Sequence, residues 1–244
     1  MNLREKLLVK IIHRLSEKFK DRLVLKGGML LRLLNSNRST QDVDYVFLSK
    51  VSKKILVVGL REALAEIEEI TLLDTRLNSR GIFFDLISKE EPDQKLQVEI
   101  SVKSTLHLPP APLATTALAN QYALTGRVIS TMALPEAFAH KIAATLEREV
   151  MRDLYDLSIL EPLCHFDHET LQERLQSLTI RRQKPRKVDW QEASVLLQSR
   201  SDNLSAEKVK KELFPLLPSH QQQGILPIIK ASVGRIISRM AARA

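Results

Sequence analysis

The sequence predicts an α+β protein, with a mixed sheet and flanking helices over residues 1–133 and a helical domain over residues 134–244. Three observations predict this organisation. Strand-like runs alternate with helical runs through the first half of the chain, a glycine pair separates an expected strand from an expected helix, and the pattern from Pro135 onward is helical almost throughout. A chain of 244 residues can bury a sizeable core and fits one large domain or two modest ones.

The first expected elements alternate between helix and strand. Residues 3–19 carry apolar side chains at helical spacing, namely Leu7, Leu8, Ile11, Ile12, Leu15 and Phe19. A short strand over residues 22–26 then leads into the glycine pair, a helix follows over residues 28–34, and a second strand covers residues 42–48.

The next expected elements form the rest of the sheet. A helix from about residue 53 to residue 70 precedes strands over residues 71–77, 81–88 and 95–103. The turn-like sequence Asn-Ser-Arg-Gly at residues 78–81 joins the first two of these strands. Three prolines, at residues 109, 110 and 112, then interrupt the pattern before another strand-like run at residues 127–132.

A glycine pair and two closely spaced acids form the most informative motif. Gly27 and Gly28 allow the backbone to approach a phosphate closely, and the amides at the start of the helix after them would face that phosphate. Asp42 and Asp44 are two positions apart on an expected strand, so both side chains project from one face. Two such carboxylates repel each other unless a cation lies between them. An isolated Asp-x-Asp is also typical of a solvated strand edge or an acidic turn, but the preceding glycine pair favours a nucleotide site with Mg²⁺ bound to Asp42 and Asp44.

A third acid is expected on the strand over residues 95–103. Its apolar residues alternate with polar ones, and Glu99 stands on the polar face of an otherwise buried strand. The alternative is that Glu99 is an ordinary surface residue of the strand with no role in the site. Asp85, on the preceding strand, is the competing candidate for the third acid.

These residues resemble the motifs of a known family. The AbiEii/AbiGii-type nucleotidyltransferase toxins, within the DNA polymerase β-like superfamily, carry Gly-Gly or Gly-Ser at a strand-to-helix turn and Asp-x-Asp on the next strand. Further along they carry a Lys and then an Arg-Asp-x-x-Asp-Leu signature. The matching positions here are Lys26, Gly27, Gly28, Arg38, Thr40, Asp42, Asp44, Lys141 and residues 152–157. The resemblance spans roughly residues 22–160 and does not cover the C-terminal third.

The resemblance implies a nucleotidyltransferase fold and assigns roles to the matching residues. Asp42 and Asp44 would bind Mg²⁺, and Glu99 would assist as a metal ligand or proton acceptor. The nucleotide-binding residues would be Lys26, Gly27, Gly28, Arg38 and Thr40. Lys141 and Asp156 would also serve the active site.

Lys141 and Asp156 pose a geometric problem at the level of the sequence. With Arg148 and Arg152 they lie near one face of a single continuous helix, which would place them about 22 Å apart at ~1.5 Å per residue. A break between residues 147 and 152 would bring them together, but this segment has neither the Gly nor the Pro that family members often carry there. The alternative is a salt-bridged pair of amphipathic helices, with Arg152 and Asp153 as capping or paired residues.

The charge of the chain favours polyanionic partners. The formal net charge is +8, and five cations stand close together at Arg181, Arg182, Lys184, Arg186 and Lys187. Arg235, Arg239 and Arg243 repeat every four residues near the C-terminus. Both clusters suggest contact with RNA phosphates, whereas solvated basic loops are the common alternative. Aromatic residues that could stack on bases are few, and Trp190 and Tyr122 are the candidates.

The remaining composition points to a cytoplasmic protein that does not enter membranes. The single cysteine, Cys164, cannot form an internal disulfide, which is typical of a reducing compartment. No apolar run is long enough to span a bilayer. Cys164, His165 and His168 have a ligand-like spacing but lack a fourth ligand, so a zinc site is not expected.

The expected function is therefore metal-dependent nucleotidyl transfer. We expect an enzyme that moves NMP from an NTP to an RNA acceptor, with tRNA implied by the resemblance. The resemblance also implies the toxin component of a bacterial toxin–antitoxin or abortive infection system, neutralised by a cognate antitoxin. Two alternatives stay open: a catalytically silent nucleotide-binding regulator, and transfer of the nucleotide to a protein or a small molecule.

Overall fold

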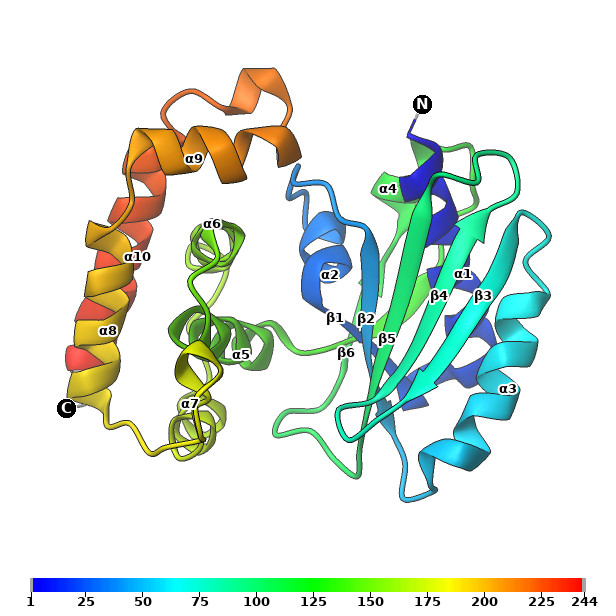
Figure 1. Cartoon of the computed structure of the whole chain (residues 1–244), viewed down its shortest axis with the longest axis horizontal. Coiled ribbons are helices and arrows are strands. Elements are labelled where there is room, and N and C mark those ends of the chain that lie inside the picture. The colour runs from blue at the N-terminus through cyan, green and yellow to red at the C-terminus, as the bar shows by residue number, and fades with distance from the viewer. Residues whose placement is uncertain (1, 243–244) are drawn as a thin grey trace. The chain divides into compact units, whose positions relative to one another are not determined.

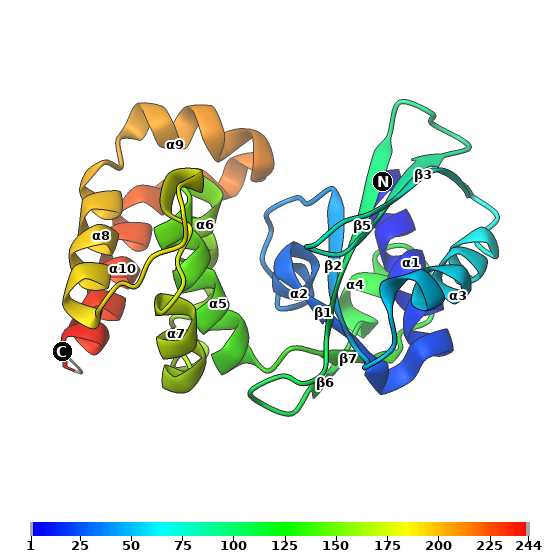
Figure 2. The same cartoon turned by 60° about the horizontal axis from the view of Figure 1, so that its bottom comes forward.

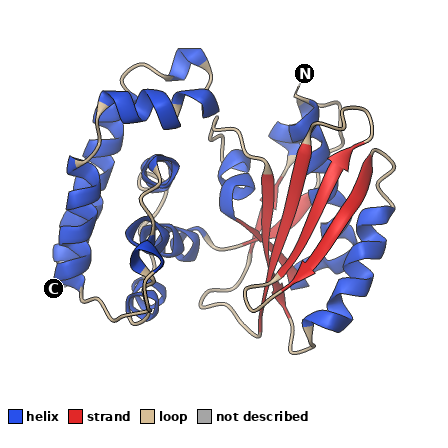
Figure 3. Cartoon of the chain, in the orientation of Figure 1, coloured by secondary structure: helices blue, strands red, loops and turns tan. Residues whose placement is uncertain are grey.

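The computed structural model describes residues 2–242 and divides into two compact units, Met1–Ala133 and Leu134–Ala244 (Figure 1). Strands belong to the first unit, whereas the second is built from helices (Figure 3). The predicted α+β class, a mixed sheet with flanking helices followed by a helical region, is confirmed. Within residues 2–242, no helix is both long enough and apolar enough to cross a membrane.

The first unit is built on a mixed sheet of seven strands in the order β3-β4-β5-β2-β1-β7-β6. Pairing is parallel between β1 and β7 and between β2 and β5, and antiparallel elsewhere. The strands are β1 (Leu23–Lys26), β2 (Asp42–Leu48), β3 (Ile70–Leu77), β4 (Ile82–Ser88), β5 (Lys95–Lys103), β6 (Ala111–Ala114) and β7 (Val128–Thr131). The helices of this unit are α1 (Leu3–Phe19), α2 (Gly27–Leu33), α3 (Lys53–Ala65) and α4 (Thr116–Asn120), with a 3-10 turn at Lys20–Arg22.

The alternation of side chains along β2 separates a core face from a functional face. Val43, Tyr45 and Phe47 are fully or almost fully buried, and the Phe47 ring meets the Phe19 ring of α1 edge-on at 5.4 Å. Helices α1 and α3 lie on this side of the sheet, and α2 lies on the other (Figure 2). The carboxylates at the start of β2 therefore project away from the core that α1 and α3 cover.

Most of the predicted elements of this unit form within one or two residues of their expected bounds, and three elements differ from the prediction. The predicted helix over residues 53–70 ends at Ala65, because Ile70 pairs with Ser88 at the start of β3. Strand β6 was not predicted, since Pro112 interrupts the strand pattern. It lies at the edge of the sheet, where a missing N–H is tolerated. The short helix α4 was also missed within the segment between β6 and β7.

The second unit packs six helices together. They are α5 (Leu134–Glu147), α6 (Met151–Leu160), α7 (His168–Leu175), α8 (Trp190–Asp202), α9 (Ala206–Glu212) and α10 (Ile225–Ala241). Short 3-10 turns occupy Ile180–Arg182, Phe214–Leu216 and Ser219–Gln221. Helix α5 packs against α6 and α7, and α10 packs against α6 and α8. Arg235 and Arg239 of α10 both bond to the buried carboxylate of Glu161, at 2.6 and 2.8 Å, so these two cations hold helices together; Arg243 lies outside the described residues.

Candidate active site

Three carboxylates gather on the functional face of the sheet. Asp42 and Asp44 occupy the first and third positions of β2, and Glu99 of β5 is the register partner of Asp44. Paired residues of a parallel ladder project to the same side, so Glu99 stands beside Asp44 on the face that carries Asp42. The sheet thus brings together acids that are 55 or more positions apart in the chain.

The glycine turn lies directly against these acids. Gly27 has φ +71°, in the left-handed region, and a Cβ placed on it would lie 2.0 Å from Asp44 Oδ2. A Cβ on Gly28 would lie 2.8 Å from Thr40 Oγ1 and 3.1 Å from an Arg38 guanidinium nitrogen. Glycine is required at both positions because polar side chains fill the space where a Cβ would stand.

Gly27→Ala is expected to lower nucleotidyl transfer by on the order of 10²-fold, because the new Cβ must displace the Asp44 carboxylate and misplaced catalytic groups cost about that much. It should also destabilise the fold by roughly 1–2 kcal/mol through its left-handed backbone. Gly224→Ala is the matched control, since Gly224 has φ +70° with no atom within 4 Å of the new Cβ. Transfer assays and thermal unfolding of both variants separate the two effects. Equal activity of both variants would contradict this role of Gly27.

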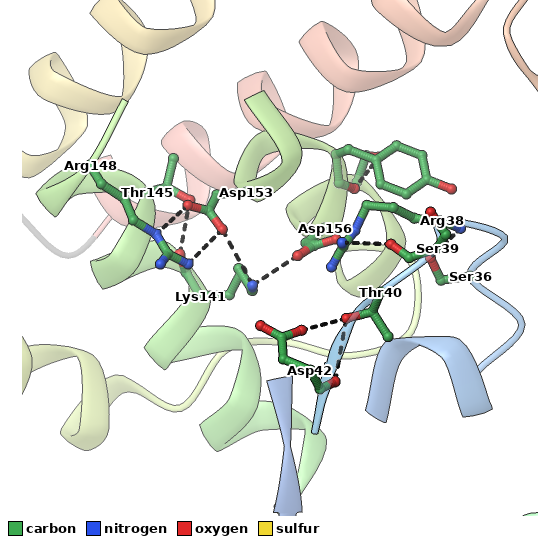
Figure 4. Close-up of polar contacts among 12 residues, drawn as sticks. Ser36, Arg38, Ser39, Thr40, Asp42, Lys141, Thr145, Arg148, Asp153 and Asp156 are labelled. Carbon is green, nitrogen blue, oxygen red and sulfur yellow. Dashed lines mark hydrogen bonds and ion pairs between the residues drawn. The ribbon is translucent and has the colours of Figure 1, made fainter. Parts of the chain in front are cut away.

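The other predicted nucleotide-binding residues surround the glycine turn. Lys26 pairs with Asp44 in the β1–β2 ladder, and its Nζ lies 4.0 Å from Asp44 Oδ1. Thr40 Oγ1 donates a 2.6 Å hydrogen bond to Asp42 Oδ1 (Figure 4). Arg38 is buried and donates to the Ser39 carbonyl at 3.2 Å. The hydrogen bond between Thr40 and Asp42 could not be predicted from the sequence spacing. It orients the carboxylate of Asp42, a predicted metal ligand.

The two candidates for the third acid have different surroundings in the structure. Asp85 stands opposite Gln97 in the β4–β5 ladder and accepts a 2.8 Å hydrogen bond from it. Arg76 also approaches Asp85 Oδ2 at 2.7 Å. Asp85 is therefore engaged away from the aspartate pair, whereas Glu99 stands next to Asp44.

The electrostatics of the acid group fit a bound cation. Burial and the neighbouring carboxylates of Asp44 and Asp42 raise the pKa of Glu99, and this outweighs the opposing effect of Lys26 and Arg80. Among residues 2–242, no group of three or more His, Cys, Asp and Glu side chains is arranged so that it could hold a metal ion. Mg²⁺ does not need such a group, because it keeps waters and is bound through one or two carboxylates plus substrate phosphates. The side-by-side aspartates supply the hard oxygen ligands that such an ion takes.

Lys141 forms a buried charged cluster in the helical unit. Its Nζ lies 2.8 Å from Asp156 Oδ2 and 3.4 Å from Asp153 Oδ1 (Figure 4). Arg148 binds Asp153 through two hydrogen bonds, at 2.6 and 2.9 Å. The side chains of Asp153 and Asp156 are fully buried. Burial alone would lower the pKa of Lys141, but these carboxylates raise it, so the lysine is a cation.

Of the arrangements that the sequence left open for residues 141–156, the single continuous helix is not the one found. Helix α5 ends at Glu147 and α6 begins at Met151, with Val150 in an extended conformation at φ −114° and ψ 123°. The chain thus turns back, and Lys141 meets Asp156 although 15 positions separate them. Neither Gly nor Pro makes this break. Two features stabilise the break instead: Arg148 binds Asp153 across it, and Met151 and Leu154 are buried at the start of α6. The sequence left Asp153 as a capping or a paired residue, and the paired interpretation is the one found.

The predicted RNA-binding cluster is partly neutralised. Arg181 pairs with Glu149 at 2.5 Å, and Arg186 pairs with Glu192 at 2.5 Å. Lys184 and Lys187 are exposed, and the side chain of Arg182 lies outside the described part of the structure. Of the two aromatic candidates for base stacking, Tyr122 is buried and donates to Glu5, so its ring is not a stacking surface. Trp190 remains partly exposed at the start of α8.

Comparison with known families matches residues 11–227 to the family described as nucleotidyl transferase AbiEii toxin, type IV toxin–antitoxin system. The match includes most of each unit, the Gly-Gly and Asp-x-Asp residues of the first unit, and Lys141 and residues 152–157 of the second. A comparison with curated proteins found no match.

Solved structures with the same fold include JHP933 from Helicobacter pylori, 17% identical, with a TM-score of 0.58 over 99% of this chain and 93% of that one. The nucleotidyltransferase toxin MenT4 from Mycobacterium tuberculosis H37Rv is 20% identical, with a TM-score of 0.61 over 99% of this chain and 87% of that one. A nucleotidyltransferase-like protein from Paracoccidioides brasiliensis is 15% identical, with a TM-score of 0.51 over 91% and 97% of the two chains. At these identities the likeness establishes the fold.

Proposed function

Because the chain belongs to the AbiEii nucleotidyl transferase toxin family of type IV toxin–antitoxin systems, we propose that it transfers NMP from an NTP to an RNA acceptor, with Mg²⁺ bound at Asp42 and Asp44. The observation that carries this proposal is the position of Glu99 and Asp44 as neighbours on one sheet face, with Asp42 beside them and Gly27 packed against Asp44. A tRNA acceptor and neutralisation by a cognate antitoxin are part of the same proposal. Both follow from the family resemblance.

The chain supplies binding, orientation and a proton acceptor. The amides of Gly27 and Gly28 and the ammonium of Lys26 bind the triphosphate, with Arg38 and Thr40 lining the same turn. A hydroxyl oxygen of the acceptor attacks the α-phosphorus in line, the bond from that phosphorus to the bridging oxygen breaks, and pyrophosphate leaves. The proton of the attacking hydroxyl passes to Glu99, whose raised pKa suits a proton acceptor better than an ordinary glutamate. Asp42 and Asp44 would hold Mg²⁺, which would supply charge neutralisation at the reacting phosphate.

Lys141 and Asp156 keep their place in the proposal on the strength of the family signature. Their direct contact removes the geometric objection that a single helix raised. Asp156 orients the ammonium group of Lys141, which as a compact point charge suits a phosphate oxygen.

The direct test mixes the purified protein with each α-labelled NTP, Mg²⁺ and total RNA. Label in RNA that disappears when EDTA is added supports the proposal. NTP binding without incorporation would instead identify a silent regulator, and label in added protein or an aminoglycoside would move the acceptor to another class.

Glu99→Gln is expected to reduce transfer by roughly 10²- to 10⁴-fold, the usual contribution of a positioned proton acceptor. Asp85→Asn should change it little, because Asp85 is engaged by Arg76 and Gln97. Initial rates of the two variants at saturating NTP decide between the candidates. A larger loss for Asp85→Asn would reverse the assignment of the third acid.

A further inference from the structure

A pocket of about 540 Å³ opens in the helical unit between α7 and the start of α8. It is lined by His168, Glu169, Gln172, Glu173 and Trp190. The first four lie on one side of α7, where positions one turn apart are neighbours, and Trp190 is the first residue of α8. The pocket therefore combines two aromatic rings with carboxylate and amide groups.

The indole ring of Trp190 is held in place on the protein side. The buried ring of Phe166 stacks against it, with centroids 6.3 Å apart and planes 28° apart. His168 lies at 5.9 Å from the same indole, and the indole N–H donates to Gln172 Oε1. Trp190 lines the pocket and is half-buried. This is a rigid aromatic surface that a flat ligand can contact at little entropic cost.

A basic segment is anchored beside this pocket. Leu178 and Arg186 exchange two backbone hydrogen bonds of 3.0 Å, and the Val188 amide donates to the Leu175 carbonyl of α7 at 2.9 Å. These bonds fix both ends of the loop that carries Lys184 and Lys187, three to six positions before Trp190. Both lysine side chains are exposed. The loop thus places cations next to an aromatic pocket.

We propose that this pocket binds an unpaired nucleobase of single-stranded RNA, stacked on Trp190, while Lys184 and Lys187 contact the adjoining phosphates. Single-stranded RNA is recognised by stacking of its bases on aromatic side chains and by hydrogen bonds to their edges. The inference rests on the proposed function and deepens it, because it gives the acceptor RNA a second contact region in the helical unit.

The carboxylates of the pocket predict which bases it accepts. Glu169 and Glu173 are exposed acceptors at the pocket wall. They suit bases with an exocyclic amino group, which guanine, adenine and cytosine carry and uracil lacks. The same carboxylates repel phosphate, so the backbone of the RNA belongs on the lysine side. Oligo(U) is therefore expected to bind more weakly than oligo(A) or oligo(C).

The wild-type protein carries its own probe, because Trp190 is the sole tryptophan of the chain. Titration with short single-stranded RNA is expected to quench its fluorescence, since a base stacked on the indole removes excited-state emission. AMP at the same base concentration should quench far less, because its single phosphate cannot contact both Lys184 and Lys187. Equal quenching by AMP would identify a free-nucleotide site, and unchanged fluorescence on bound RNA would overturn the inference.

Variants extend the test with labelled RNA followed by anisotropy. Trp190→Ala should weaken binding roughly tenfold or more, and Trp190→Phe should restore part of it. Val195→Ala, which removes an exposed apolar side chain from the same helix, is the matched control and should bind normally. A plot of the logarithm of the binding constant against the logarithm of the salt concentration has a negative slope. Lys184→Ala and Lys187→Ala should each make this slope smaller in magnitude by about 0.7. If the Trp190→Ala variant is folded and binds the labelled RNA as tightly as the wild type does, the proposal is contradicted.

Failure of this inference can be told from failure of the proposed function. The binding measurements contain no NTP, so they need no turnover. Label transfer to RNA that is unaffected by Trp190→Ala would refute the pocket and leave the enzyme intact. If RNA quenches Trp190 fluorescence but the wild-type protein transfers no nucleotide, the pocket is supported and the proposed enzymatic function is refuted.

Discussion

Asp42→Asn and Asp44→Asn are each expected to reduce nucleotidyl transfer by on the order of 10³-fold or more, because each would remove one of the charged oxygen ligands proposed for Mg²⁺, and such a ligand stabilises a transition state by several kcal/mol. Asparagine keeps the shape of the side chain, and at Asp42 it can still accept the 2.6 Å hydrogen bond from Thr40. We therefore expect far-UV circular dichroism and the thermal midpoint to stay close to those of the wild type. Incorporation of labelled NMP into RNA, measured at several Mg²⁺ concentrations, gives the activity.

The control for this prediction is Asp74→Asn, since Asp74 is an exposed acid on the edge strand β3. Its transfer rate should match that of the wild type. A folded double variant of Asp42 and Asp44 that still transfers nucleotides would remove the metal site from the mechanism. A loss of folding in both single variants would show instead that the acids have a structural role.

Asp153→Ala is expected to destabilise the helical unit by about 3–5 kcal/mol, the usual effect of removing one partner from a buried ion pair. The Asp153 carboxylate is fully buried and bonds to both Arg148 and Lys141. Its removal leaves the mostly buried Lys141 with Asp156 alone and breaks the contacts that span the gap between α5 and α6. Urea unfolding followed by Trp190 fluorescence measures this, because that tryptophan lies in the same unit.

Two comparisons isolate the buried charge from other effects. Asp153→Asn retains a hydrogen-bond acceptor and should give an intermediate loss of stability. Asp202→Ala removes an exposed acid at the end of α8 and should change stability by no more than about 0.5 kcal/mol. If Asp153→Ala behaves like Asp202→Ala, the cluster contributes no net stability.

Local sequence patterns predicted most of the first unit because its strands have clear alternation. The bounds of β2 and β5 agree with the predicted strands over residues 42–48 and 95–103. Strand β6 was not predicted, because a proline is tolerated in a strand only when that strand lies at the edge of the sheet. Which strand lies at the edge depends on the complete topology of the sheet. The end of α3 at Ala65 likewise depends on the pairing of β3 with β4, which the apolar spacing of that segment does not reveal.

The sequence by itself determined how residues a few positions apart are arranged. The two-residue period of a strand places Asp42 and Asp44 on one face, and only glycine suits the backbone of the turn before them. The tertiary structure alone decided which distant groups meet these residues or one another. The parallel register of β2 and β5 places Glu99 beside Asp44, and the break after α5 brings Asp156 to Lys141. The reason is that register and helix breaks depend on the burial of side chains from the whole unit, whereas spacing along the chain reports only local geometry.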